Sequence, residues 1–142
     1  MTFFVDSNVL VYAAVPSSPY SGPCLEILTA VASGTAAGRT STAALEEVWH
    51  LERTGRAGSL EGLTKRSYAV FQPLLAVTDE AFRLALGISS SRLGANDRLH
   101  VGTCRANDIR TIVTADTGFD RLTGIRRVDP LNAPALTRLL AP

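Results

Sequence analysis

The sequence predicts an α/β fold in which a central, mainly parallel β-sheet is flanked by helices. Short runs of β-branched and aromatic residues, such as FFVDSNVLVY near the start and TIVTA at 111–115, are typical of buried strands. These runs alternate with longer segments whose apolar residues recur at helical spacing, and this alternation favours parallel strands joined by helices. The 142 residues suit one compact domain, and a hydrophobic content of 46% is enough to give it a core.

The first half of the chain is predicted to contain two strands, each followed by a helix. The β-branched run is expected to end as a strand near Asp6, and PSSPYSGP then interrupts regular structure with three prolines and a glycine. Apolar spacing predicts a helix over 24–32. The segment AAGRTST is expected to be a short strand that runs into a helix, which Ser41 or Thr42 caps and which ends before Gly55.

The second half is predicted to be mostly helical, with two further strands near its end. Two helical segments are separated by the short run LLAVT, which is a candidate strand. Asn96 or Asp97 is placed to cap the helix that precedes TIVTA. The expected elements are helices over 60–74, 79–89 and 96–107, strands over 111–115 and 125–129, and a final helix over 134–140.

Charge and cysteine content narrow the function classes. The 14 basic and 13 acidic residues leave a net charge of +1, so no overall field marks the chain as a nucleic-acid or membrane binder. The longest apolar run, Val9–Val15, is far shorter than the roughly 20 residues that span a bilayer, and the first residues lack the basic start of a signal peptide. We expect a cytoplasmic protein without membrane contact, in which Cys24 and Cys104 are buried thiols.

Acidic residues stand where the expected strands end. Asp6 closes the first strand and Asp116 directly follows TIVTA, and the carboxyl ends of neighbouring parallel strands share one crevice. Asp97, Glu46 and Glu47 lie in the first turns of helices, where an acidic side chain also has the ordinary role of satisfying free N–H groups. Crowded carboxylates repel one another, and a divalent cation with oxygen ligands, Mg²⁺ or Mn²⁺, removes that conflict.

Four segments carry a family resemblance: FVDSNVLVY, TSTAALEEVWHL, NDRLHVGTCRANDIRTIVTAD and TGFDRL stand in this order between Phe4 and Leu122. The ordered set resembles the PIN-domain ribonucleases, and specifically the VapC toxins of bacterial toxin–antitoxin pairs. The resemblance implies a PIN-domain fold, a three-layer α/β/α arrangement, in a single domain that spans residues 1–142. Many relatives have D-A-L-H-L-A where this chain has DRLHVG, so Arg98 and Gly102 replace a small apolar residue and an alanine.

The resemblance implies four acidic active-site residues, which are Asp6, Glu47, Asp97 and Asp116. The three aspartates would bind one or two Mg²⁺ ions, for which Mn²⁺ is a substitute. The glutamate would hold the attacking water or serve as general base. Glu46 stays open as the alternative to Glu47, and Glu47 and Asp120 are further candidate ligands.

The implied reaction is metal-assisted hydrolysis of structured RNA, such as transfer or ribosomal RNA, by a toxin that inhibits translation and growth. A polyanion that approaches an acidic pocket needs basic residues at the rim of that pocket. The candidates for RNA contact are Arg98, Arg121, Arg53 and Arg56, together with Lys65 and Arg66.

The resemblance also implies partners. A VapB-like antitoxin would cover the acidic cleft, and a homodimer of this chain would join the antitoxin in a hetero-oligomer. Core packing is the ordinary role of aromatic side chains, but an exposed group of them would serve either contact. The candidates are Tyr12, Trp49, Tyr68 and Phe71.

Other function classes fit the sequence less well. The E-x-x-H and D-x-x-H spacings at 47–50 and 97–100 suit a di-iron carboxylate bundle, but that architecture is all-helical. We expect both histidines to be helix residues that pack near the sheet, and a zinc site would need His100, Cys104 and distant partners.

A phosphoaspartate enzyme needs a lysine after a late strand, whereas Lys65, the only lysine, lies in mid-chain. The sequence also lacks a Walker P-loop for binding nucleotides. A catalytically silent PIN module that acts by binding is the alternative function.

Overall fold

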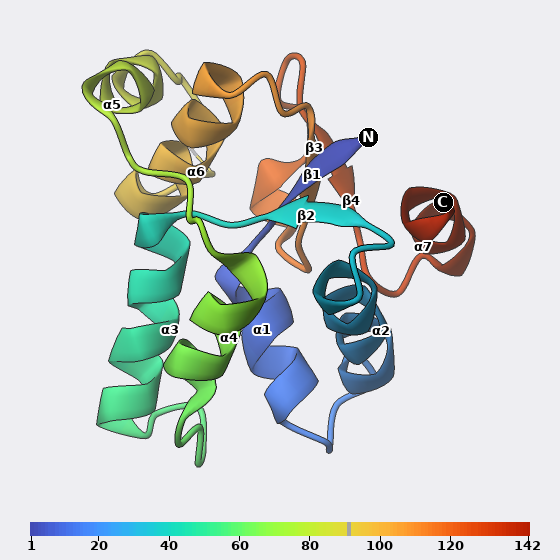
Figure 1. Ribbon diagram of the computed structural model, residues 1–142. Coiled ribbons are helices and arrows are strands. Elements are labelled where there is room, and N and C mark those ends of the chain that lie inside the picture. Colours follow the sequence, from blue (N-terminus) through green and yellow to red (C-terminus); the bar gives the residue numbers. More distant parts are fainter. Residues whose placement is uncertain (91) are drawn as a thin grey trace.

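A four-stranded parallel sheet forms the centre of the computed structural model, which describes residues 1–90 and 92–142 (Figure 1). Its strands are β1 (Thr2–Val5), β2 (Ala37–Arg39), β3 (Thr111–Val113) and β4 (Arg126–Val128), in the order β2-β1-β3-β4. Phe4 of β1 is paired with Arg39 on one side and with Ile112 on the other. The chain therefore crosses over β1 on its way from β2 to β3, and the direction of strand addition reverses between β1 and β3.

Seven α-helices surround the sheet in the described part of the chain. They are α1 (Ser7–Ala14), α2 (Ser21–Ala32), α3 (Thr42–Thr54), α4 (Leu63–Phe71), α5 (Asp79–Leu86), α6 (Ala95–Ala106) and α7 (Ala133–Leu140), and a short 3₁₀ helix, η1 (Thr117–Phe119), follows β3. None of these helices is both long enough and apolar enough to cross a membrane. Cys24 and Cys104 are buried free thiols, and burial raises the pKa of each to about 12.

The side chains of the sheet alternate between two cores. Phe3, Val5 and Val113 lie in a core that they share with residues of α1, α2, α3, α4 and α7. Phe4 and Ile112 face the opposite side, where they pack with residues of α6 and η1. The expected arrangement, a parallel sheet with helices on both faces in three layers, is confirmed.

Helix α1 has no counterpart in the sequence prediction, because its residues, SNVLVYAA, are rich in strand-forming types. The helix forms directly after Asp6, whose side chain accepts a hydrogen bond from the backbone nitrogen of Ser7 and caps the first turn. Val9 and Leu10 are then fully buried on its sheet-facing side. The predicted end of the strand near Asp6 is confirmed, and the cap by Asp6 begins a helix that the sequence does not predict.

Two expectations about local structure are wrong. Helix α6 begins at Ala95 with Gly94 as its N-cap residue, so neither Asn96 nor Asp97 caps it, and the side chain of Asp97 is left for other contacts. The run LLAVT is not a strand, because only one of its residues, Leu75, pairs in an isolated bridge, with Ser41. Ser41 does cap α3, where its side chain accepts from the backbone nitrogen of Ala44, and α3 ends at Thr54, before Gly55, as predicted. Gly55 is the C-cap residue and lies in the left-handed region.

Gly102 lets α6 approach α5 closely. A Cβ atom at this position would overlap the carbonyl oxygen of Ala81 and would lie 3.0 Å from the backbone nitrogen of Ala85. Both neighbours are backbone atoms, which cannot move aside as the end of a side chain can. The absence of a side chain therefore sets the spacing of the two helices, and with it the position of Asp97 on α6.

We expect Gly102→Ala to destabilise the protein by about 1–3 kcal/mol, since overpacking at the helix contact outweighs the better helix propensity of alanine. Urea unfolding measures the effect. Gly22→Ala in α2 is the matched control, because no atom lies within 4 Å of the place its new methyl group would take, and its stability should stay equal or rise. Equal stabilities for both variants would contradict the close approach of α5 and α6.

Candidate active site

The carboxyl ends of β1 and β3 meet at the point where the strand order reverses, and two polar residues stand there. Asp6 directly follows β1, and its backbone nitrogen donates to the carbonyl oxygen of Val113 at 3.1 Å. Thr114 directly follows β3. In open parallel sheets, ligands bind in the crevice outside such a reversal point. The fold therefore places the predicted first aspartate at the position that most favours a ligand site.

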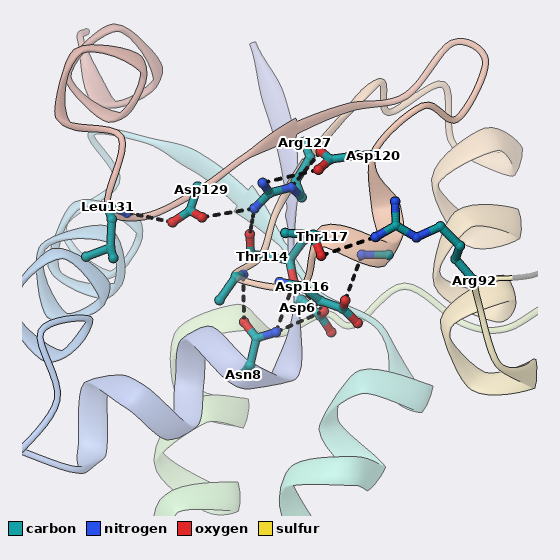
Figure 2. Close-up of polar contacts among 12 residues, drawn as sticks. Asp6, Asn8, Arg92, Thr114, Asp116, Thr117, Asp120, Arg127, Asp129 and Leu131 are labelled. Atoms are coloured by element: carbon teal, nitrogen blue, oxygen red, sulfur yellow. Dashed lines mark hydrogen bonds and ion pairs between the residues drawn. The ribbon is translucent and has the colours of Figure 1, made fainter.

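The carboxylate of Asp6 is buried, with only 3% of the residue exposed, and several donors hold it (Figure 2). One oxygen accepts from the backbone nitrogen of Ser7 at 2.7 Å, and the other accepts from the hydroxyl of Thr114 at 2.8 Å. The Asn8 amide donates to the same hydroxyl oxygen at 2.9 Å. Burial raises the pKa of Asp6 more than the nearby His100 ring and the Thr114 hydroxyl lower it.

Glu47 of α3 and His100 of α6 meet beside Asp6. His100 Nε2 lies 2.7 Å from Glu47 Oε1 and 3.6 Å from Asp6 Oδ1, and the imidazole is fully buried. Phe4 packs against the ring, with 5.5 Å between the ring centroids. The Ser7 hydroxyl donates to the same Glu47 oxygen at 3.3 Å. Burial acts to lower the pKa of His100, but the hydrogen bond with Glu47 and the surrounding carboxylates outweigh it and raise the pKa.

Asp97 and Asp116 extend this acidic group. Asp97 lies in the first turn of α6 and is partly buried. Burial, together with the negative charges of Asp6, Glu47 and Asp116, raises the pKa of Asp97 from an ordinary 3.8 to about 6. Asp116 is exposed and caps η1, where its Oδ1 accepts from the backbone nitrogen of Gly118 at 2.8 Å. The four predicted acidic residues thus interact electrostatically although they come from four separate parts of the chain.

The donor set fits a divalent cation. Ligand atoms of Asp6, Glu47 and His100 all lie within 4.8 Å of one another. Asp97 and Asp116 add carboxylate oxygens, which are the ligands that Mg²⁺ and Mn²⁺ prefer. Burial first, and the neighbouring negative charges second, raise the pKa values of Asp6 and Asp97, so ionising all these carboxylates at once would leave an excess of negative charge with little solvent to stabilise it. A bound cation would remove this excess, so the residues present suit the metal that the sequence predicts.

A family model described as the PIN domain matches residues 3–125 of this chain. The chain belongs to the PIN domain family. A similar solved structure is VapBC2 from Rickettsia felis, bound to a DNA fragment from its promoter. Its TM-score is 0.69 at 15% sequence identity, and the match covers 91% of this chain and 98% of that chain. FitAB bound to an IR36 DNA fragment has a TM-score of 0.61 at 18% identity over 90% of this chain and 94% of that chain. The comparison with curated proteins finds no match.

The two adjacent glutamates of this PIN domain lie in different surroundings. Glu47 contacts His100 and Ser7 inside the acidic group. Glu46 is exposed and lines a separate groove between α3 and α4, beside Trp49 and Tyr68. Neighbouring residues on a helix point about 100° apart, so the rotation of α3 about its axis directs only one of them to the crevice. The geometry favours Glu47 as the active-site glutamate.

Asp120 belongs to an ion pair and not to the acidic group (Figure 2). The guanidinium of Arg127 donates to Asp120 Oδ1 at 2.8 Å, to Asp129 at 3.1 Å and to the carbonyl oxygen of Thr114 at 3.0 Å. The hydrogen bond from Arg127 lowers the pKa of Asp120. Asp120 therefore helps to hold the loop after β3, and its part as a further metal ligand stays a prediction.

Arg98, one of the expected RNA contacts, also has a role inside the fold. Its guanidinium donates to the carbonyl oxygens of Leu93 and Ile88, each at 3.0 Å, and to that of Ser90. These bonds hold the backbone between α5 and α6, and RNA contact by the partly exposed Arg98 stays a prediction. The remaining candidates for RNA contact are exposed: Arg53, Arg56, Lys65, Arg66 and Arg121.

Two residues of the site were not expected from sequence. His100 does pack near the sheet, as predicted, but it also joins Glu47 to Asp6. The D-x-x-H spacing carries this signal, since positions three apart lie on one face of a helix. Arg127 anchors the loop that carries Asp116, and nothing in the sequence distinguishes it from Arg126 except the alternation of side chains along β4.

We expect Asp97→Asn to raise the stability of the metal-free protein at pH 7.5. Because the folded pKa of Asp97 is raised, its ionisation opposes folding, and this penalty grows as the pH rises from about 4 through about 6. The full shift corresponds to at most about 3 kcal/mol, which solvent screening reduces to about 1–2 kcal/mol. Urea unfolding in EDTA at pH 4 and 7.5 measures the difference between variant and wild type. A variant that is less stable at pH 7.5 would make Asp97 a structural residue.

Proposed function

We propose that this PIN domain, residues 1–142, is a Mg²⁺-dependent endoribonuclease, with Mn²⁺ as a substitute, and the toxin component of a type II toxin–antitoxin system. Its substrate would be structured RNA such as transfer or ribosomal RNA, and its action would inhibit translation. The observation that carries the proposal is the gathering of four carboxylates at the reversal point of the sheet, where burial and mutual repulsion raise the pKa of Asp97 to about 6. A cluster of carboxylates with so little positive charge around it would bind a cation, which suits metal-assisted hydrolysis of a phosphodiester.

The active-site residues would have two different roles in this reaction. Asp6, Asp97 and Asp116 would hold the cation, which supplies Lewis acidity to the phosphate and makes water a stronger acid. One oxygen of Glu47 is hydrogen-bonded to His100 and Ser7, and the other has no hydrogen-bond partner among the described residues, so it would orient the attacking water and accept a proton from it.

Neutral residues hold these carboxylates in place. The Thr114 hydroxyl donates to Asp6 and accepts from the backbone nitrogen of Asp116 at 3.1 Å, so one side chain sets the positions of two aspartates. Asn8 bridges the start of α1 to the loop after β3, since it donates to Thr114 and accepts from the backbone nitrogen of Ala115 at 3.3 Å. This bracing supports a preorganised site, which needs little rearrangement when the substrate binds.

The proposed protein partner is a VapB-like antitoxin, which would join a homodimer of this chain in a hetero-oligomer in the cytoplasm. The likeness to the VapBC2 and FitAB structures supports a partner of this type. The groove between α3 and α4 has a volume of about 700 Å³ and exposes Trp49 and Tyr68. Of the other two apolar candidates, Phe71 is buried, whereas Tyr12 is partly exposed and stacks on Tyr20.

We expect the purified protein to cleave total cellular RNA in the presence of Mg²⁺ or Mn²⁺ and to lose this activity in EDTA. Asp116→Asn should also lose activity, and because Asp116 is exposed this variant should fold normally. Gel analysis of the RNA and circular dichroism of the variant are the two measurements. Cleavage that survives both EDTA and the substitution would overturn the metal-nuclease proposal. A folded wild type that cleaves no RNA with either metal would favour the silent binding module.

We expect Glu47→Gln to lower kcat by about 100-fold or more, as removal of a general base does. Glu46→Gln is the matched control, one residue away on the exposed side of α3, and should stay within about twofold of wild type. Initial rates on a fluorogenic oligoribonucleotide measure both. The reverse pattern would mean that α3 presents Glu46 to the crevice.

A further inference from the structure

A second concave surface lies next to the acidic group, and its lining is basic. It is formed by the residues that follow α5, by Arg105 of α6 and by the segment after η1. It has a volume of about 810 Å³ and is called the arginine groove below. Its lining residues include Arg92, Arg105, Asp120 and Arg121. Aromatic side chains do not occur among the described residues of its lining, so it offers charge and hydrogen bonds without a surface on which bases could stack.

Three guanidinium groups in the arginine groove have no acidic partner within ion-pair distance in the described part of the chain. Arg105 donates to the carbonyl oxygen of Thr123 at 3.0 Å, and Arg92 reaches the Thr117 hydroxyl at 3.5 Å, but neither contact neutralises a charge. The ion pairs of the described residues do not include Arg121. The carboxylate of Asp120 also lines the groove, but Arg127 already compensates it from the sheet side.

Arg92 connects the arginine groove to the edge of the acidic group. Arg92 bonds to Thr117, which directly follows Asp116, and Figure 2 shows its side chain reaching toward that residue from the neighbouring loop. Arg105 lies eight residues after Asp97 on α6, about 12 Å along the helix axis. Positive charge therefore begins at the exposed edge of the acidic group and extends along one side of α6.

The backbone at Arg121 adds a second observation. Its φ of 67° lies in the left-handed region, which a residue with a Cβ atom adopts at a cost in energy. Such conformations persist where the surroundings hold them, and they are common at ligand sites. At this position the chain turns directly after Asp120, and the arginine is left exposed in the groove.

We propose that the arginine groove binds the phosphodiester backbone of the single-stranded RNA segment next to the scissile phosphate. This inference rests on the proposed nuclease function and names the path by which the substrate reaches it. Arg92 would contact the phosphate nearest to Asp116, and Arg105 and Arg121 would contact phosphates farther along the strand. Because the groove offers no stacking surface, binding there depends on charge and little on base sequence.

The test compares two triple variants that remove the same charge. In the groove variant, Arg92, Arg105 and Arg121 are each replaced by Gln. In the control variant, the same change is made at three exposed arginines outside the groove, Arg110, Arg126 and Arg138. Fluorescence anisotropy with a labelled single-stranded oligoribonucleotide in EDTA gives Kd at several salt concentrations, and gel analysis verifies that the RNA stays intact.

We expect the groove variant to bind the RNA about 10- to 100-fold more weakly than wild type. The slope of log affinity against log salt concentration should also be shallower by about 1–2, because each phosphate contact on a single strand contributes about 0.7 to this slope. The control variant should stay within about threefold of wild type. A third variant with Lys at the three groove positions keeps the charge and should bind nearly as wild type does. Equal weakening of the groove and control variants, or unchanged binding by a folded groove variant, would overturn the proposal.

Cleavage assays with Mn²⁺ separate this proposal from the nuclease function. If both hold, the groove variant has a raised KM with a kcat closer to wild type. RNA binding that depends on the groove in a wild type that cleaves no RNA would refute the nuclease function and support the groove. Cleavage with an unchanged KM in the groove variant would refute the groove and leave the nuclease function standing.

Discussion

The hydrogen-bonded burial of Asp6 is the interaction on which the rest of the site depends. A buried carboxylate is tolerated only where donors or opposite charges compensate it. Here they come from the start of α1, from Thr114 after β3 and, at 3.6 Å, from His100 on α6. The same contacts therefore join the ends of β1 and β3 and position the first aspartate.

Charge separation organises the surface around this point. The net charge of +1 combines a group of carboxylates at the end of the sheet with arginines that either support the fold or stay free. Arg98 and Arg127 are of the first kind, since each binds carbonyl oxygens of loops that flank the crevice. Three of the free arginines, Arg92, Arg105 and Arg121, line the groove near the acidic group, so opposite charges lie close together within one small domain. Such an arrangement suits a ligand that is itself an anion and also needs a cation.

The sequence predicts the fold well because the pattern of strands and helices is a local property. It also predicts that Asp6 and Asp116 lie close together, since parallel strand ends meet, whereas Glu47 and Asp97 follow only from the family resemblance. It does not reveal α1, because SNVLVYAA has the composition of a strand and its helix depends on a cap by Asp6. The choice between Glu46 and Glu47 depends on how α3 rotates against the core. The course of the loop that Arg98 binds is likewise set by tertiary packing.

The close contact at Gly102 has a consequence for exchange of parts between members of this family. In a relative with the D-A-L-H-L-A pattern that the sequence resembles, the last position is an alanine, whose methyl group would require α5 to lie farther from α6 than it does here. The two helices of this chain form a matched pair, because their spacing leaves no room for that methyl group. A chimera that takes α6 from such a relative and keeps α5 from this chain would join surfaces shaped for different spacings. Recombination within the family should thus preserve residues 79–106 as one block.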